Sequence, residues 1–285
     1  MVSLYKSAQR KKEILALYDT KMSSLGVRFS EEVVSTSFGT THVIACGDDE
    51  KSPMILVHGS NGCAPIALET YKDLLGKYKL YAVDVLAQPN KSAETRLSMK
   101  DTSYGIWMQE VISGLGLQQV SLAGFSFGGL IILKTLEYQE SNIEAVYLSS
   151  PAYIVNGNPL KALFKVFIPM KRYMKTEKVS YVEKFLAAVF TDRDAFAIAY
   201  LSKVFLYFTM DFTPVPVIKK SAAQSIQTPI SIFAADDDIM FPGAKMMKRA
   251  QKIFPSLKKI ELITDSKHVQ NAKQNSEISQ VILQA

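Results

Sequence analysis

The sequence predicts an α/β fold in which helices cover both faces of a mainly parallel sheet. Short apolar runs, each of the length of a buried strand, alternate along the 285 residues with longer stretches of helical periodicity. Residues 153–222 interrupt this alternation once. We therefore expect a core domain formed by residues 1–152 and 223–285, and a helical lid subdomain formed by residues 153–222 and inserted before the penultimate strand.

The expected elements follow one another in chain order. An N-terminal helix covers about residues 7–24, and two strands at 32–38 and 41–47 flank Gly39-Thr40 as an antiparallel hairpin. Further strands are expected at 53–59, 79–86, 119–124, 143–150, 229–235 and 258–264. Helices are expected at 65–75, from the capping residue Asp101 to 115, at 129–139 and at 276–283. In such a sheet, ligand chemistry lies at the carboxyl ends of the strands.

The inserted stretch differs from the rest of the chain in composition. Residues 153–222 contain eleven Lys or Arg against five acids, which accounts for the whole net charge of +6. They also hold 13 of the 29 aromatic residues. Solvated helix faces would explain the charge, but a basic face also attracts anionic lipid surfaces or acidic substrates. We expect weak association with an anionic membrane surface and, because no recognition module is present, no nucleic-acid partner.

The N-terminal sequence and the cysteines indicate a cytoplasmic protein. Charged residues interrupt the stretch where a signal peptide needs a continuous apolar block. The most apolar window, residues 195–210, is 16 residues long and contains Lys203, whereas a spanning helix needs about 20 apolar residues. Cys46 and Cys63 have neither disulfide-framework nor metal-ligand spacing, so we expect reduced thiols and no metal site.

The motif that carries the strongest chemical signal is Gly124-Phe125-Ser126-Phe127-Gly128, which fits G-x-S-x-G. A strand is expected directly before it and a helix directly after it, as a nucleophile elbow requires. A serine on such a sharp turn has a strained backbone, and side chains at positions 124 and 128 would collide with neighbouring elements. The helix that follows points its N-terminal N–H groups toward the reacting carbonyl. We therefore expect Ser126 to be a nucleophile.

Three histidines compete for the role of the base that a serine nucleophile needs. His42 lies in the early hairpin, far from the carboxyl ends of the strands. His58 ends a strand at a glycine-containing turn, which it is expected to support. His268 follows the last strand on a loop at the correct end of the sheet, so we expect it to be the base.

An acid must orient that base, and the loop after the penultimate strand offers Asp236, Asp237 and Asp238. Asp84 is a rival on another loop, but a turn-capping role suits it better. An acid after the penultimate strand can reach a base on the loop after the last strand. Along the chain the serine then comes first, the aspartate second and the histidine third, which is one of the known orders of a serine nucleophile, its acid and its base.

With these residues, the chain resembles the α/β-hydrolases, and among them the lid-bearing serine esterases, from about Val33 onward. In that family the penultimate strand is commonly followed by G-x-x-D-x-x-x-P, which residues 235–242 match with Ala for Gly, and this register implies Asp238. His58-Gly59-Ser60 resembles the family's H-G-x loop, which implies that the backbone N–H groups of Ser60 and Phe127 form an oxyanion hole.

Two stretches depart from the family pattern. Residues 84–92 match the D-x-x-G-x-G-x-S turn only loosely, with Ala87 and Pro89 in place of glycines, and Lys267 precedes His268 where Gly is usual. These changes concern the shape of loops rather than the reacting groups. The assignment of Ser126, Asp238 and His268 therefore stands.

The resulting hypothesis is a serine hydrolase that cleaves a carboxylic ester of an apolar small molecule through an acyl-enzyme. Serine at the elbow favours acyl transfer, whereas aspartate there would favour carbon–halogen or epoxide displacement. No cofactor is needed. The alternatives are another acyl hydrolase, a C–C bond hydrolase or a perhydrolase with the same triad, and a ligand-binding receptor that uses the lid pocket. The aromatic residues expected to wall an apolar acyl pocket are Phe164, Phe167, Phe185, Phe190, Phe196, Phe205 and Phe208.

Overall fold

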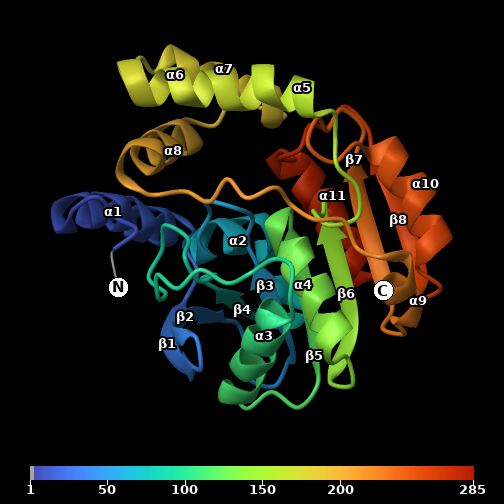
Figure 1. The fold of residues 1–285 in the computed structure, drawn as a ribbon. Helices are drawn as coiled ribbons and strands as arrows, with labels where there is room; N and C mark the ends of the chain where they lie inside the picture. The colour runs from blue at the N-terminus through green and yellow to red at the C-terminus, as the bar shows by residue number, and fades with distance from the viewer. Residues whose placement is uncertain (1–2) are drawn as a thin grey trace.

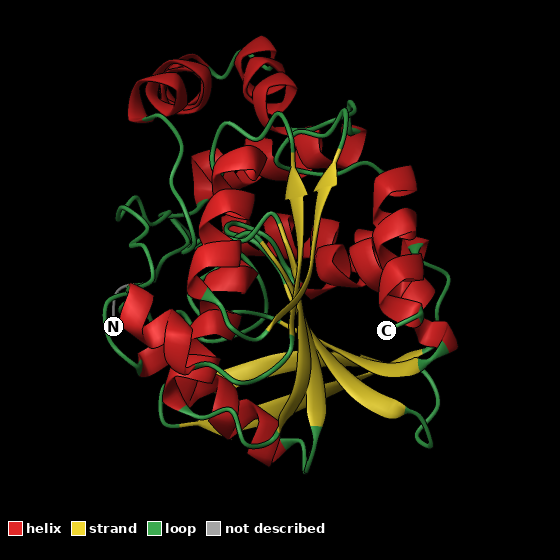
Figure 2. Ribbon diagram, turned by 90° about the vertical axis from the view of Figure 1, so that its right-hand side faces the viewer, coloured by secondary structure: helices red, strands yellow, loops and turns green. Residues whose placement is uncertain are grey.

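A single eight-stranded sheet organises the molecule, which is described here over residues 3–285 from a computed structural model. Its strands are β1 (Phe29–Thr36), β2 (Gly39–Cys46), β3 (Ser52–Val57), β4 (Tyr78–Val83), β5 (Val120–Phe125), β6 (Ile143–Ser149), β7 (Ile230–Ala235) and β8 (Leu257–Ile263). Their order across the sheet is β1-β2-β4-β3-β5-β6-β7-β8. The strand β2 pairs antiparallel with β1 and β4, and all other pairs are parallel. Figure 2 shows the strong twist of this sheet.

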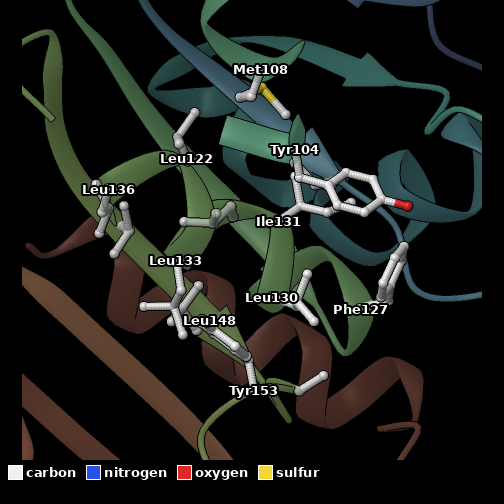
Figure 3. Packing of buried hydrophobic residues seen from close by; sticks show 14 of the residues in the cluster. Tyr104, Met108, Leu122, Phe127, Leu130, Ile131, Leu133, Leu136, Leu148 and Tyr153 are labelled. Carbon is white, nitrogen blue, oxygen red and sulfur yellow. The ribbon is translucent and has the colours of Figure 1, made fainter. Parts of the chain in front are cut away.

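Helices cover both faces of the sheet, as the alternating pattern predicts (Figure 1). They are α1 (Ala8–Ser24), α2 (Ala64–Tyr71), α3 (Ser103–Gly114), α4 (Phe127–Tyr138), α9 (Lys220–Ser225), α10 (Gly243–Ile253) and α11 (Ala272–Leu283), with a 3₁₀ turn, η1 (Lys72–Gly76), after α2. Buried side chains of α3, α4, α9 and α10 form one hydrophobic core with the sheet, part of which Figure 3 shows. Those of α1, α2 and α11 form a second core on the other face.

Several local features differ from the sequence prediction, among them the start of α3, whose N-cap is Thr102 rather than Asp101. The hairpin turn lies at residues 37–38, because Gly39 already pairs with Thr36. The helix α11 begins at Ala272 rather than 276, since Asn271 and Gln274 form a capping box. The helix α10 had no predicted counterpart, although it is strongly amphipathic and buries Met246, Ala250 and Ile253.

The stretch between β6 and β7 contributes helices that lie over one end of the sheet (Figure 1). They are α5 (Pro159–Ala162), a π-helical turn η2 (Leu163–Phe167), α6 (Ile168–Thr176), α7 (Ser180–Val189) and α8 (Ala195–Tyr207). The end of α7 is bridged to the loop after β8, where Phe190 pairs with Val269. The end of α8 is bridged to the N-terminal segment, where Phe208 pairs with Tyr5. Among the described residues, no helix is both long and apolar enough to cross a membrane.

Candidate active site

Ser126 lies at the sharp turn between β5 and α4, with φ 53° and ψ −112°. This left-handed φ costs energy in a residue with a Cβ, and the surrounding backbone holds it: the Ser126 N–H donates to the Ser149 carbonyl at 3.0 Å. A Cβ at Gly128 would lie 2.2 Å from the Val57 carbonyl oxygen, and one at Gly124 would lie 2.6 Å from the Ile132 side chain. The two glycines are thus required by close packing on either side of the serine.

The structure brings Ser126, His268 and Asp238 into one hydrogen-bonded chain. The Oγ of Ser126 lies 2.9 Å from Nε2 of His268, and Nδ1 of His268 lies 2.7 Å from Oδ2 of Asp238. All three residues are buried. The His268 ring also packs against the rings of Phe125 and Phe241, at centroid distances of 5.1 and 5.4 Å. The imidazole is therefore held by both hydrogen bonds and aromatic contacts.

The loop that carries His268 is fixed to the end of α7. The N–H of Val269 donates to the carbonyl of Val189 at 2.8 Å, and the N–H of Thr191 donates to the carbonyl of Val269 at 3.0 Å. Lys267, which stands where the family pattern has glycine, donates from Nζ to the carbonyl of Ala187 at 2.8 Å. This lysine therefore joins the base-bearing loop to the insertion.

Neither His42 nor His58 takes part in the site around Ser126. Buried His58 lies under the turn that follows β3: its Nδ1 is 2.7 Å from the Gly59 carbonyl, and its Nε2 accepts the Val85 N–H at 3.0 Å. Burial lowers the pKa of His58, which favours the neutral ring that these two contacts require. His58 thus has the supporting position that the sequence indicates.

Asp84 is a fully buried structural carboxylate rather than a partner of His268. One of its oxygens accepts the Ala64 N–H at 2.7 Å, at the start of α2. The other lies 3.0 Å from both the Tyr18 hydroxyl and Nδ1 of His42. Asp84 therefore joins α1, the β1–β2 hairpin and the beginning of α2, in keeping with the capping role expected for it.

Ser60, Ser126 and Phe127 all line the same cavity. Phe127 is the first residue of α4, so its N–H belongs to the group of helix N-terminal donors without intrahelical partners. Ser60 lies in a turn closed by the Gly62 N–H and the Gly59 carbonyl at 3.1 Å.

Gln88 is a residue of this region that sequence analysis did not single out. Its Oε1 accepts the N–H of Asn61 at 2.7 Å, directly after Ser60, and Asn61 has a positive φ of 57°. Ala87, which replaces a glycine of the family pattern, likewise has a positive φ of 54°. The signal that could have drawn attention to Gln88 is its place in the loop that departs from the family pattern.

A cavity of about 1060 Å³ opens at Ser126 and is bounded by residues of the core and of the insertion. Five of the seven aromatic residues predicted to wall it do so: Phe167, Phe185, Phe190, Phe196 and Phe205. The prediction is wrong for Phe164, which is 64% exposed, and for Phe208, which packs on Tyr5 at a ring-centroid distance of 5.0 Å. Phe164 lies in the π-helical turn η2 and Phe208 follows the end of α8, so regular helical periodicity does not fix the direction of either side chain.

Other reactive or ligating groups are few in the described part of the chain. Burial raises the pKa of the Cys63 thiol well above its ordinary value, and the residue is inaccessible. Within residues 3–285, no group of three or more His, Cys, Asp or Glu side chains is arranged to hold a metal ion.

The sheet order and the strained serine turn are those of the α/β-hydrolase fold, and the chain is an enzyme of this fold. Comparison with known proteins makes the similarity more particular, because the proteins that the chain resembles are carboxylesterases. The chain is 24% identical over 281 residues to the uncharacterized carboxylesterase nap of Bacillus subtilis, a match that covers 93% of this chain and 89% of the relative.

Two further comparisons agree with this assignment. Carboxylesterase YbfK of Bacillus subtilis is 31% identical over 135 residues, which cover 47% of this chain and 46% of that protein. The crystal structure of naproxen esterase from Bacillus subtilis superimposes with a TM-score of 0.85 at 23% identity, covering 98% of this chain and 99% of that one. No family model matches the chain.

Proposed function

We propose that this protein is a serine hydrolase that cleaves carboxylic esters of apolar small molecules, with Ser126, His268 and Asp238 as its catalytic triad. The observation that carries the proposal is the hydrogen-bonded chain from Ser126 Oγ through His268 to Asp238, at 2.9 and 2.7 Å. Such a chain supplies the three functions that acyl transfer to serine requires: a nucleophile, a base and a group that orients the base.

The first half of the reaction forms an acyl-enzyme. His268 Nε2 takes the proton of the Ser126 hydroxyl as Oγ attacks the ester carbonyl carbon. The carbonyl oxygen becomes an oxyanion, which accepts hydrogen bonds from the N–H groups of Ser60 and Phe127. When the tetrahedral intermediate collapses, the C–O bond to the alcohol breaks and Nε2 returns the proton to the leaving oxygen.

The second half repeats these steps with water as the nucleophile. Water loses a proton to His268, adds to the acyl carbon, and releases the carboxylic acid while Ser126 regains its proton. Asp238 keeps the Nδ1–H of His268 directed toward itself throughout and stabilises the imidazolium. The two N–H groups of Met240 and Phe241, which donate to the other Asp238 oxygen at 2.7 and 3.0 Å, hold the carboxylate in place.

The cavity supports an apolar substrate. Residues 153–222 are proposed to act as a lid subdomain over Ser126, and six phenylalanines of this stretch line the cavity. A cavity of about 1060 Å³ accommodates a small molecule with a bulky acyl or alcohol part. Apolar walls favour such groups because burial removes their surface from water.

Activity toward a panel of p-nitrophenyl esters tests the proposal. We expect hydrolysis that rises from acetyl to longer or bulkier acyl groups and then falls when the cavity is filled. Ser126→Ala is the matched control, which removes only the hydroxyl oxygen. A folded wild-type protein that binds these esters without turnover would indicate the alternative of a receptor. Turnover that persists in Ser126→Ala would overturn the assignment of the nucleophile.

A further inference from the structure

The first part of the insertion has an unusual charge. Between Tyr153 and Thr176 the chain contains five basic residues and no acid: Lys161, Lys165, Lys171, Arg172 and Lys175. All five are exposed. Among the ion pairs formed by the described residues, none involves any of these five. Their charge is therefore directed to solvent rather than neutralised within the protein.

Large apolar side chains are exposed at the same place. Leu160, Leu163 and Phe164 are 63%, 43% and 64% exposed, and Phe212 is 44% exposed. Phe212 lies beside η2, with its ring 6.3 Å from that of Phe167, and the Nζ of Lys171 lies 4.8 Å from the Phe212 centroid. We call Leu160, Leu163, Phe164 and Phe212 with the five basic residues the basic apolar patch. Figure 1 shows that α5 and α6 are in the layer farthest from the sheet.

We propose that the basic apolar patch docks this enzyme on anionic lipid surfaces. Leucine and phenylalanine side chains insert at the boundary between headgroups and acyl chains, and lysines near them are attracted to anionic headgroups. The patch offers both contributions on the segment from α5 to α6, together with Phe212. This assigns the expected membrane association to α5, η2, α6 and Phe212 rather than to the insertion as a whole.

Charge favours a lipid surface over a second copy of the chain. Two copies that met through this patch would bring ten uncompensated positive charges together, since each patch has five basic residues and no acid. Like charges at an interface oppose association. An anionic bilayer, in contrast, supplies many negative charges and an apolar layer beneath them.

The same segment faces the cavity with its other side. Pro159, Ala162, Val166 and Phe167 line the cavity, whereas Leu160, Leu163 and Phe164 do not. Phe212 is the one apolar residue of the patch that also lines the cavity. Docking would therefore place one wall of the cavity against the lipid surface. If the proposed esterase function holds, an apolar ester dissolved in the bilayer reaches Ser126 from that side; the docking itself does not depend on the reaction.

Vesicle flotation of the full chain tests the proposal. The two vesicle types are phosphatidylcholine alone and phosphatidylcholine with about 30% phosphatidylglycerol, each at about 0.05 M and 0.5 M salt. We expect binding to the anionic vesicles to be at least about tenfold tighter than to neutral ones at low salt, and to weaken at high salt. Equal binding to both vesicle types, or none to either, would overturn the proposal.

Variants assign the binding to the patch. Phe164→Asp and the pair Lys161→Glu with Lys165→Glu should each reduce binding about tenfold or more. Two control variants make the same changes in polarity and charge elsewhere on the surface and should retain vesicle binding. They are Val33→Asp, at another exposed apolar residue, and the pair Lys248→Glu with Lys252→Glu on α10. Loss of binding in both sets would show a general charge effect and contradict the assignment.

A fluorescent variant and a soluble substrate complete the test. The only tryptophan, Trp107, is fully buried, so the emission of Phe164→Trp should shift to shorter wavelength with anionic vesicles while the wild type does not change.

All patch variants should hydrolyse a soluble p-nitrophenyl ester without vesicles at the wild-type rate. A failure of that activity in the wild type would refute the esterase proposal but not the docking. The docking would be refuted if the wild type did not bind vesicles but formed a dimer, or a complex with an acidic protein, that Phe164→Asp abolished.

Discussion

Asp236, Asp237 and Asp238 follow one another after β7, yet their side chains have different surroundings. Asp238 is buried against His268, whereas Asp236 accepts the N–H groups of Asp265 and Ser266 at 3.1 and 3.0 Å. Asp237 is exposed, and no hydrogen bond of its carboxylate was found. One carboxylate thus faces the base, one supports the loop that carries the base, and one faces solvent.

These surroundings predict three graded results for substitution by asparagine. Asp238→Asn should lower kcat by about 10³ to 10⁴, because the amide favours the wrong tautomer of His268. Asp237→Asn is the matched control and should leave kcat unchanged. The kcat of Asp236→Asn should lie between those of the other two variants, because asparagine keeps only one of the two oxygens that accept hydrogen bonds from the loop of His268. Steady-state kinetics with parallel melting curves checks this; a larger loss at position 236 or 237 than at 238 would contradict the assignment of the acid.

Gln88 is predicted to act as a positioning residue for the oxyanion loop. Gln88→Met keeps the size of the side chain but removes the acceptor for the Asn61 N–H, so Ser60 loses the contact that holds its neighbour. Loss of an oxyanion donor typically costs about 10² to 10³ in kcat, and an indirect effect should be smaller, about tenfold, with KM little changed.

The conservative variant separates positioning from stability. Gln88→Glu retains an acceptor oxygen and should restore most of kcat. Melting temperature should be similar in both variants. Equal kcat in wild type and Gln88→Met, or a parallel fall of kcat and melting temperature in both variants, would show that Gln88 does not position the loop for catalysis.

Ser126, His268 and Asp238 could be singled out from the sequence as the proposed triad, whereas Gln88 could not be singled out. Ser126 carries a local motif, His268 is one of only three histidines, and the family pattern selects Asp238. The contact from Gln88 to Asn61 instead joins two loops that are 27 residues apart. No local periodicity or motif encodes such a pairing, because it depends on how β3 and β4 lie side by side.

At the scale of elements, a partly buried cluster of ionisable side chains joins α1 to the β1–β2 hairpin and is predicted to make stability depend on pH. His42 lies between Asp84 and Glu31, at 3.0 and 2.9 Å, with the Tyr18 hydroxyl 3.3 Å from its Nδ1. Burial lowers the pKa of His42, but the two carboxylates raise it by more, so the net shift is upward. Lys91 neutralises part of the negative charge by pairing with Glu31 at 3.1 Å.

A raised pKa in the folded state fixes the direction of this pH dependence. The stabilisation is fully present below the unfolded pKa of about 6.5 and is lost as pH rises through the folded value. Glu31 has the opposite behaviour: its lowered pKa gives a contribution that is lost in acid. The cluster therefore stabilises most in weakly acidic solution.

Thermal unfolding of the wild type and His42→Gln tests this cluster. The difference in melting temperature should be largest near about pH 6 and should shrink toward about pH 9. The glutamine is neutral throughout this range, so it serves as the reference at each pH. A difference that is constant with pH, or that grows as pH rises, would contradict the account.

The insertion shows which features of an element can be predicted from composition. The boundaries 153–222 remain a prediction, but the helices α5 to α8 lie within this stretch, and residues of these helices line the cavity at Ser126. The outward position of Phe164 was not predictable, because η2 is a π-helical turn and changes the angular spacing of its side chains. The side-chain directions in η2 therefore follow from its packing against α6 and α7 rather than from a regular helical period.

At the scale of the whole molecule, the site lies where the two hydrophobic cores meet the insertion. Strands β5, β7 and β8 are each followed within five residues by one residue of the proposed triad, and parallel strands present their carboxyl ends on the same edge. The alternating sequence predicts all eight strands, and this explains why distant residues could be expected to meet. Loop conformations, in contrast, follow from contacts between elements.

Covalent labelling of Ser126 tests the central claim most directly. A fluorophosphonate reacts with an activated serine, so the folded wild type should incorporate one label, located by mass spectrometry on the peptide that contains Ser126. Ser126→Ala should incorporate none, and Asp238→Asn should react far more slowly because its base is misoriented. Label on another residue, or no label on well-folded wild-type protein, would contradict the account.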